Sequence, residues 1–345
     1  MIRVALITEQ LRRPTPGGIG RYATCLHDAL RSRSDVDVEA VQGRLPTEIT
    51  TRIWSAGFPR YVDADIVHAT SFSFPRTVGR ARTTVFIHDV LWRGAGFGSL
   101  TARGLRFHER GLKLALSRAD RILVPSFAVR DALVAGGVGA NAVVVTGEGA
   151  DHLPVRPRAL GGSVVLSVGT LEPRKNLLRL LAAFDDVRRR MNDPVVLRIV
   201  GSNSWRAEPG LPAELPDGVE LIGSVTDEQL AELFASATAF VFPSMGEGYG
   251  LPPVEAMRAG VPVVCAPVPS VVESLTDGGG PIDAARQAFE SIDPTDVASI
   301  ARGLERVLRS DARRSELTAR GFDWASGRTW ANVAQRHMDL WAALR

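Results

Sequence analysis

Cysteine is scarce in this chain, and long apolar runs are absent from it. Cys25 and Cys265 are the only cysteines among 345 residues, and they lie far apart in the sequence. This excludes a disulfide framework and a cysteine-based metal site, and it favours a reducing compartment. No apolar run approaches the roughly 18 residues of a membrane-spanning helix, and the run within "MIRVALITEQ" is too short for a secretory signal. We therefore expect a cytoplasmic protein.

Charge of one sign is not in large excess either, since the formal net charge is only +3. The two halves nevertheless differ: residues 1–150 carry 20 Lys and Arg against 13 Asp and Glu, whereas residues 151–345 carry 21 against 25. The balance is therefore +7 in the first half and −4 in the second. A basic first half indicates either an anionic partner or an uneven surface that is merely solvated. We expect no nucleic-acid partner.

Short apolar runs alternate with helix-length amphipathic segments along the whole chain. Such alternation predicts an α/β fold, with parallel sheets covered by helices on both faces. It occurs twice, on either side of a segment rich in Pro and Gly at 152–163. We expect two Rossmann-like, doubly wound domains that face each other across a cleft, at 1–155 and 160–327, followed by a terminal helix over 328–345. Helices are predicted at 19–33, 101–118, 177–190, 227–236, 253–259 and 294–309.

Ligands of such folds bind at the carboxyl ends of the strands, so the loops that follow strands are the places to search. In "PGGIGRYATCLHDAL", Gly17, Gly18 and Gly20 open the helix expected at 19–33. Glycines there would let backbone N–H groups approach an anion at the helix N-terminus. A tight loop that binds no ligand would explain these glycines equally well, and the full dinucleotide fingerprint is missing.

A second candidate lies in "SVGTLEPRKNLLRLL", where a strand ends at Gly169 and a helix begins near Asn176. Arg174 and Lys175 therefore lie at the positive end of a helix, where cations are disfavoured. A conflict with a local rule often marks a functional site, and a docked diphosphate would remove this one. The alternative is that both side chains extend into water, where a lysine would contribute little to stability.

A third candidate is "FPSMGEGYGLPPVEAMRAG", between an apolar strand and the helix expected at 253–259. Glu255 would fall in the first turn of that helix, where a carboxylate complements the helix dipole or accepts hydrogen bonds from a ribose diol. Glu247 precedes the helix and has no such structural duty. We therefore interpret Glu247 as a contact to a polar ligand.

Four segments together resemble one known family. Glu247 and Glu255, eight positions apart in "EGYGLPPVEAM", look like the paired-glutamate motif of the retaining GT-B glycosyltransferases of family 4, the glycogen synthase and mannosyltransferase group. "GTLEPRKN" is similar to that family's diphosphate-binding segment, "GGIGRY" to its N-terminal glycine loop, and "IHDV" at 87–90 to its donor-side histidine motif. The resemblance covers nearly the whole chain, with the segments in the order of the family.

The resemblance implies that the second domain binds a nucleotide-sugar donor, that the first binds an acceptor, and that the terminal helix packs back toward the first domain. Glu255 would bind the ribose, and Glu247 a hydroxyl of the donor sugar. Arg174 and Lys175 would bind the diphosphate, the more so because Thr170 replaces an arginine of many relatives. The implied catalytic residues are His88, Arg174, Lys175 and Glu247. The implied nucleotide-binding residues are Gly17, Gly18, Arg174, Lys175, Glu247, Gly248, Tyr249, Gly250, Leu251 and Glu255.

The implied activity is transfer of a hexosyl group from a nucleoside-diphosphate sugar to a hydroxyl acceptor, with retention of configuration. "GTLEPRKNL" is most similar to mannosyltransferases, which favours GDP-mannose and leaves a UDP-sugar open. The acceptor stays open between a lipid-linked molecule and an oligosaccharide. A nucleotide-sugar epimerase of the same fold is the alternative. We expect no cofactor and no metal, since the triplets at 35–37 and 63–65 are interpreted as a solvated strand face and a turn.

Residues 101–118 form a basic amphipathic pattern. Arg103, Arg106, Arg110 and Lys113 share one helical stripe, beside an apolar stripe with Leu105, Leu112 and Leu116. Such a helix lies on an anionic membrane or, with the same pattern, packs its apolar stripe into the core. Peripheral attachment to the inner face of the membrane therefore stays open.

Overall fold

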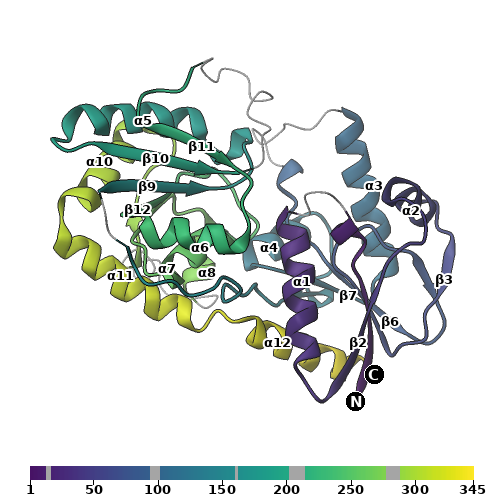
Figure 1. Ribbon diagram of the computed structural model, residues 1–345. Coiled ribbons are helices and arrows are strands. Elements are labelled where there is room, and N and C mark those ends of the chain that lie inside the picture. Colours follow the sequence, from purple (N-terminus) through teal and green to yellow (C-terminus); the bar gives the residue numbers. More distant parts are fainter. Residues whose placement is uncertain (13–16, 94–101, 160–161, 202–213, 277–287) are drawn as a thin grey trace. The chain divides into compact units, whose positions relative to one another are not determined.

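The computed structural model divides the chain into two compact units. The first contains the described residues up to Gly149 together with Thr329–Arg345, and the second contains those of Ala150–Arg328. The structure describes residues 1–12, 17–93, 102–159, 162–201, 214–276 and 288–345. Figure 1 shows the helices and strands of both units.

A sheet of six parallel strands forms the centre of the first unit, in the order β2-β1-β4-β6-β7-β8. Its strands are β1 (Ile2–Ile7), β2 (Val36–Val41), β4 (Ile66–Ala69), β6 (Arg82–Phe86), β7 (Arg121–Val124) and β8 (Val143–Val145). Two short strands, β3 (Pro59–Tyr61) and β5 (Arg76–Val78), pair separately and were not predicted. The central strands β4 and β6 are buried on both faces because helices cover both faces of the sheet.

Each face of this sheet has its own core. Helices α1 (Gly17–Arg31) and α12 (Trp330–Leu344) contribute buried residues to one of them. Helices α2 (Thr47–Ser55), α3 (Ala102–Arg118) and α4 (Phe127–Ala135) contribute to the other. Side-chain caps define two of these helices: the Ser126 hydroxyl accepts from the amide of Val129, and the Thr329 hydroxyl accepts from the amide of Asn332. Single-turn 3₁₀ helices are η1 (Glu9–Arg12), η2 (Leu91–Arg93) and η3 (Ala140–Ala142).

The second unit repeats this plan with six parallel strands in the order β11-β10-β9-β12-β13-β14. They are β9 (Ser163–Val168), β10 (Val195–Val200), β11 (Val219–Gly223), β12 (Ala239–Phe242), β13 (Val263–Cys265) and β14 (Glu290–Ser291). Helices α5 (Leu177–Arg190) and α10 (Val297–Arg309) cover one face, and α6 (Asp227–Ser236), α7 (Leu251–Arg258) and α8 (Pro269–Thr276) cover the other. Helix α11 (Asp311–Ser326) contributes to both cores. The 3₁₀ helix η4 (Pro173–Lys175) precedes α5.

The strand orders confirm the predicted α/β fold with two doubly wound sheets. In the second unit the order reverses between β9 and β12, so the chain leaves these neighbouring strands in opposite directions. Ligands of doubly wound sheets bind at such a switch point, beyond the carboxyl ends of the strands. The loops at 169–176 and 243–250, which carry the predicted residues, follow these two strands.

The starts of α10, α7 and α1 were placed wrongly. The helix expected from 294 begins at Val297, after the N-cap Asp296. The other two helices begin earlier than expected. The helix expected from 253 begins at Leu251, so Glu255 is its fifth residue and lies beyond the first turn. The dipole role considered for Glu255 is therefore lost. The helix expected from 19 begins at Gly17, so Gly17 and Gly18 are the first residues of α1 and not a loop before it. In both cases a glycine with positive φ starts the helix, at 89° for Gly250 and 62° for Gly17.

Candidate active site

Asn176 joins the two loops at the switch point of the second sheet. It has φ 60 and ψ 39, the left-handed conformation, and separates η4 from α5. Its side-chain amide donates to the carbonyl oxygens of Pro243 (3.1 Å) and Pro294 (2.6 Å). The amide of Met245 adds a bond of 2.8 Å to the carbonyl oxygen of Arg174. These bonds fix the loop after β9 against the loop after β12.

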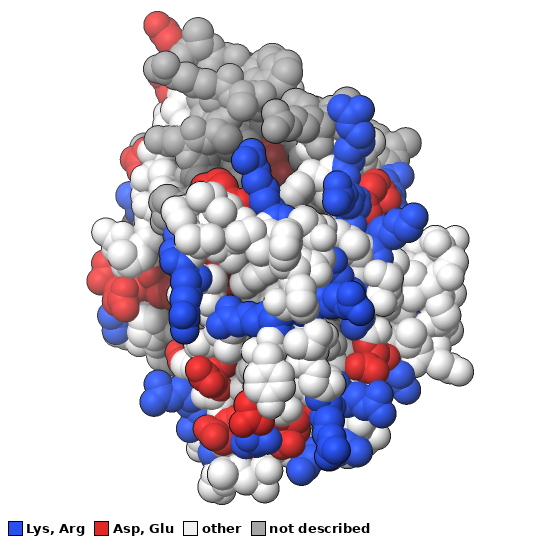
Figure 2. Space-filling view, turned by 90° about the vertical axis from the view of Figure 1, so that its right-hand side faces the viewer, with Lys and Arg blue, Asp and Glu red and all other residues white. Residues whose placement is uncertain are grey.

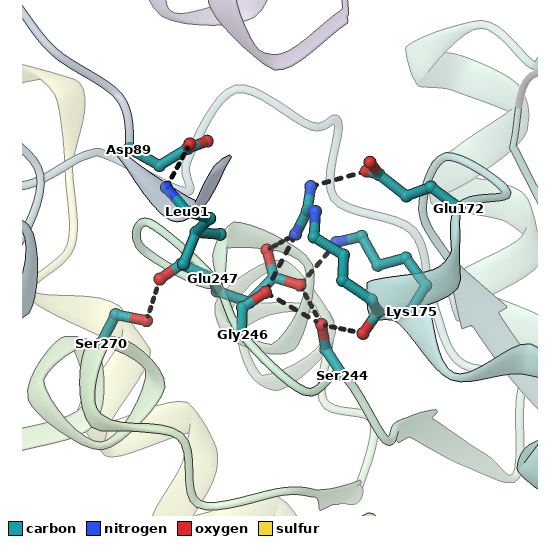
Figure 3. A network of polar contacts seen from close by, with 9 residues as sticks. Asp89, Leu91, Glu172, Lys175, Ser244, Gly246, Glu247 and Ser270 are labelled. Carbon is teal, nitrogen blue, oxygen red and sulfur yellow. Dashed lines mark hydrogen bonds and ion pairs between the residues drawn. The ribbon is translucent and has the colours of Figure 1, made fainter. Parts of the chain in front are cut away.

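The carboxylate of Glu247 lies at the centre of the joined loops (Figure 3). Lys175 Nζ lies 2.7 Å from Oε1, and an Arg174 guanidinium nitrogen lies 2.8 Å from Oε2. The hydroxyl of Ser244 also donates to Oε1. On its other side Arg174 pairs with Glu172 at 2.7 Å. Two cations and two carboxylates thus form one network that contains no net charge.

Burial governs the electrostatics of this network. The side chains of Glu247 and Lys175 are 8% and 14% exposed. Burial by itself would raise the pKa of Glu247, but Lys175 and Arg174 outweigh it and the pKa is lowered. Burial lowers the pKa of Lys175, and Glu247 partly offsets this. The alternative of a solvated lysine at a helix start is therefore wrong: Lys175 is a buried partner of a carboxylate, and its ammonium also lies 4.7 Å from the centre of the Phe242 ring.

The rest of the "GEGYGL" loop leads directly into α7. The Ser270 hydroxyl donates to the carbonyl oxygen of Glu247 at 2.8 Å and ties the loop to α8. Tyr249 is buried in the core beneath. Gly250 caps α7, and a Cβ there would lie 2.5 Å from a methyl carbon of Val271. Both this contact and the positive φ require glycine at this position.

Glu255 lies apart from this network in the described structure. Its Oε1 pairs with Nε2 of His152 at 3.0 Å, and the two side chains are 1% and 6% exposed. A carboxylate buried in this way is not open to a ribose diol until its partner or its surroundings move.

The remaining predicted residues belong to the first unit. His88 follows β6, with Nε2 3.0 Å from the carbonyl oxygen of Thr70 and Nδ1 3.5 Å from the carboxylate of Glu148. The ring of Tyr22 packs edge-on against it at 5.2 Å between centroids. Tyr22 lies on α1, the helix that Gly17 and Gly18 begin.

The structure thus unites Arg174, Lys175 and Glu247, with Gly248–Leu251 continuing the same loop. Sequence reasoning missed the partners of the predicted residues, which are Glu172 and Ser244 in this network, His152 for Glu255, and Glu148 for His88. Glu172 carried a weak signal, since it stands two positions before Arg174. Ser244 stands only three positions before Glu247, whereas His152 and Glu148 are far from their partners in sequence, and only the fold brings them together.

No group of three or more His, Cys, Asp or Glu side chains among the described residues is arranged to hold a metal ion. Asp35 and Asp37 are exposed on or beside β2. Asp63 and Asp65 accept from the guanidinium and the amide of Arg3, respectively. Asp35 and Asp37 are therefore solvated, whereas Asp63 and Asp65 bind Arg3 of β1.

Comparison with known proteins identifies relatives of this chain. A family model described as "Glycosyl transferases group 1" matches residues 153–324. The "O-antigen chain mannosyltransferase B" of Escherichia coli is 31% identical over 300 residues, which cover 81% of this chain and 74% of that protein. The "Phosphatidyl-myo-inositol mannosyltransferase" of Mycobacterium leprae is 30% identical over 211 residues, covering 59% and 54%.

Among solved structures, the sucrose-phosphate synthase of Thermosynechococcus elongatus superposes with a TM-score of 0.73 at 19% identity, covering 100% of this chain and 99% of that one. At that identity the likeness concerns the fold. It confirms the expected GT-B fold.

Proposed function

The chain belongs to the group 1 glycosyltransferases, and we propose that it transfers a mannosyl group from GDP-mannose to a hydroxyl acceptor with retention of configuration. The observation that carries the glycosyl-transfer site is the buried network of Arg174, Lys175 and Glu247 at the switch point of the second sheet. The names of the two relatives support a mannosyl donor. One of those names contains a phospholipid, phosphatidyl-myo-inositol, which supports a lipid-linked acceptor.

In this proposal the loops of the second unit bind the donor. Lys175 retains donor capacity: an ammonium has three N–H bonds, and Glu247 takes one of them in the described structure. The diphosphate would bind to Lys175 and Arg174, while Glu247 orients both cations and accepts from a sugar hydroxyl. The backbone of Gly248–Leu251 would line the nucleotide, and Gly17 and Gly18 would add amide contacts at the start of α1.

Glu255 would bind the ribose diol, which requires that it exchange its contact with His152 for hydrogen bonds to the ribose. His88 would face the donor sugar. In this proposal the ribose contact, Glu255, belongs to α7, and the sugar contact, His88, follows β6.

The reaction then balances as follows. The bond between the anomeric carbon and the diphosphate oxygen breaks, and the acceptor oxygen bonds to the same carbon on the same face. The acceptor's proton passes to the leaving phosphate, so the products are the mannoside and GDP. Negative charge grows on the leaving phosphate, and preorganised cations stabilise such a charge most strongly in the transition state.

Nucleotide binding tests the donor. If the donor is GDP-mannose, GDP should bind with a lower Kd than UDP and should raise Tm more at equal concentration. The stabilisation grows with the ratio of ligand concentration to Kd and reaches about 2.7 kcal/mol at 100 times Kd. Glu255→Ala should reduce the shift, whereas Glu220→Ala, which removes an exposed carboxylate of β11, should not. A larger shift with UDP would remove the GDP assignment. Labelled GDP-mannose incubated without acceptor separates an epimerase, which would change the sugar unaided.

Chelation tests the expectation that no metal takes part. Transfer from GDP-mannose should persist in excess EDTA, since Lys175 and Arg174 supply the positive charge at the diphosphate. Complete loss of activity that Mn²⁺ or Mg²⁺ restores would contradict this expectation.

Helix α3 of the first unit is proposed to contact an anionic membrane. Arg106, Arg110 and Lys113 are exposed, while Leu105 and Phe107 are 40% and 46% exposed beside them. Leu112 is buried in the core, so the predicted apolar stripe is divided between core and solvent. The side chain of Arg103 lies outside those that the structure describes. Figure 2 shows Lys and Arg side chains, with Asp and Glu side chains among them, between uncharged areas on the face it presents. Among the described helices, none has both the length and the apolar character needed to cross a bilayer.

A further inference from the structure

Both ring nitrogens of His88 face oxygen atoms. The carbonyl oxygen of Thr70 lies 3.0 Å from Nε2, and a carbonyl only accepts, so Nε2 carries hydrogen. Nδ1 faces Oε1 of Glu148 at 3.5 Å. With Nε2 already protonated, a bare Nδ1 would point its lone pair at a carboxylate. A proton on Nδ1 would instead turn the contact into an ion pair.

The setting strengthens this pair. The side chains of His88 and Glu148 are 17% and 10% exposed, so solvent screens their charges weakly. Their separation lies beyond the usual hydrogen-bond range of about 2.7–3.2 Å. The carboxylate therefore acts on the ring mainly through its charge, and the contact leaves room to shorten when a ligand binds.

Two hydrogen bonds hold the hydroxyl of Tyr22, the aromatic residue that packs against His88. The Nδ1 hydrogen of His337 is donated to the carbonyl oxygen of Val333 at 2.8 Å, so its Nε2 accepts from the Tyr22 hydroxyl at 2.9 Å. The Tyr22 oxygen then accepts from Nε2 of His68 at 2.9 Å. These two bonds fix the position of the Tyr22 hydroxyl, and the Tyr22 ring packs edge-on against His88.

Few other titratable groups lie next to His88 in the described structure. Burial raises the pKa of Tyr22 well above its ordinary value and lowers that of His68 well below it, so both are neutral near pH 7. Asp89 follows His88 and accepts from the backbone amide of Leu91 at 3.2 Å. Glu148 is therefore the charged group that faces the ring nitrogen.

We propose that Glu148 is a positioning residue for His88, whose carboxylate orients the imidazole and retains a proton on its Nδ1, while Tyr22 fixes the ring plane. The inference rests on the proposed function only in that His88 faces the donor sugar. Glu148 lies in "TGEGAD" after β8, outside every segment that sequence reasoning selected.

Activity as a function of pH tests the proposal. Glu148→Gln should lower kcat about tenfold, and the alkaline limb of its pH profile should move to lower pH by about one unit, because the anion that retains the proton is gone. The matched control is Glu39→Gln, which removes an exposed carboxylate of β2 in the same unit. It should leave both kcat and the limb unchanged. A merely structural role for Glu148 would lower activity without moving the limb.

Nitrogen NMR of the imidazole rings tests the pair without a donor. His88→Asn assigns the signal, and Glu148→Gln should lose the ring proton of His88 at lower pH than the wild type. Identical titration in the two proteins would overturn the proposal. If Glu148→Gln does not fold, Glu148→Asp, which withdraws the charge by one carbon, should shift the titration in the same direction by less.

The two arms separate the proposals. If the wild type does not use GDP-mannose, or if His88→Asn is fully active, the proposed donor or the role of His88 is wrong. The NMR result would still decide whether Glu148 holds the proton of His88.

Discussion

Glu247 shows what a single carboxylate does when it is buried between two cations. Its charge compensates one of the two cations, Lys175 and Arg174, and Glu172 compensates the other, so the network of four side chains is neutral before a ligand arrives. In the proposed function a diphosphate would bind the N–H groups of Lys175 that Glu247 does not take, and it would compete with Glu247 and Glu172 for those of Arg174. Because removing one partner of a buried pair leaves an uncompensated charge, each of these residues affects stability as well as chemistry.

Lys175→Ala should lower kcat by about 10²–10³, the usual cost of losing one electrostatic contact to a transition state. Arg174→Ala should behave similarly, and the double variant should be less than additive if both bind one diphosphate. Arg302→Ala, which removes an exposed cation of α10, is the control and should be fully active. Steady-state kinetics with the donor varied measure the effect. Wild-type kcat and nucleotide affinity in Lys175→Ala would mean that the diphosphate binds elsewhere.

The burial of Lys175 changes how that experiment is run. The variant should also lose stability, because Glu247 remains buried with only Arg174 as a cation partner. Urea unfolding should therefore accompany the kinetics, and kcat should be measured at a temperature at which the variant is folded.

At the scale of single residues, the sequence reveals groups that conflict with local rules but not their partners. Arg174 and Lys175 are cations at a helix start, and Glu247 is a carboxylate among glycines, so all three could be selected in advance. Ser244, His152 and Glu148 conflict with nothing locally. Their importance follows from contacts across 3 to 103 positions of sequence, namely to Glu247, Glu255 and His88.

Helix α12 illustrates how an element is fixed by hydrogen bonds rather than by apolar packing alone. The indole N–H of Trp341 donates to the hydroxyl of Thr84 at 3.2 Å. That hydroxyl lies 2.8 Å from Nδ1 of His68 and donates to it, since Nε2 of His68 donates to Tyr22. One directed chain of bonds thus runs from α12 through β6, β4 and α1 and returns to His337 on α12. The bonds run in this direction only while His68 and His337 are both neutral, since each ring accepts one bond and donates another.

This chain predicts a loss of stability in acid. Burial is the main cause that lowers the pKa of His337 from 6.5 to about 4. Between these values the unfolded chain binds a proton that the folded chain does not. The free energy of unfolding should therefore fall as the pH drops from about 6.5 toward 4, by about 3 kcal/mol for a gap of about 2.5 units. Above pH 6.5 this contribution is fully present, and His68 acts in the same direction.

Urea unfolding followed by tryptophan fluorescence measures this dependence, because Trp330 and Trp341 lie on α12. His337→Phe should be less stable than the wild type at pH 8, since it leaves the Tyr22 hydroxyl without this partner. Its stability should nevertheless fall less steeply between pH 6.5 and 4. Equal slopes in the two proteins would show that His337 does not titrate as described.

At the scale of elements, predictability follows the strength of local signals. The bounds predicted for the helices at 177–190 and 227–236 agree with α5 and α6. For α6 the cause is a capping box in which Thr226 and Gln229 satisfy each other's amides. The start of α7 was wrong because a left-handed glycine, not a polar side chain, caps it. Strands β3 and β5 have three residues each, too few for a detectable period.

At the scale of the whole molecule, the excess of basic residues in the first half of the sequence has a structural counterpart. Helix α3 exposes Arg106, Arg110 and Lys113, and its acidic residue Glu109 is already paired with Arg93. The exposed rings and chains of Phe107 and Leu105 accompany these cations. The sequence alone could not decide between a membrane face and a core face for this helix, because both patterns coincide until packing divides the apolar stripe.

Vesicle binding tests this surface. The protein should cosediment with vesicles that contain anionic phospholipid more than with purely zwitterionic ones, and added salt should weaken the binding. Each basic side chain near such a surface contributes about 1 kcal/mol, so replacing Arg106, Arg110 and Lys113 by Gln should weaken the partition on the order of 10²-fold. Replacing Arg198, Arg302 and Arg320 by Gln changes the net charge equally at one half-buried and two exposed sites of the second unit, and it should have little effect. If both triple variants lose binding equally, attraction depends on net charge alone and α3 is not the contact.

A separate variant, Phe107→Ala, leaves the charge of the protein unchanged. If it weakens binding, helix α3 enters the headgroup region as well as resting on it.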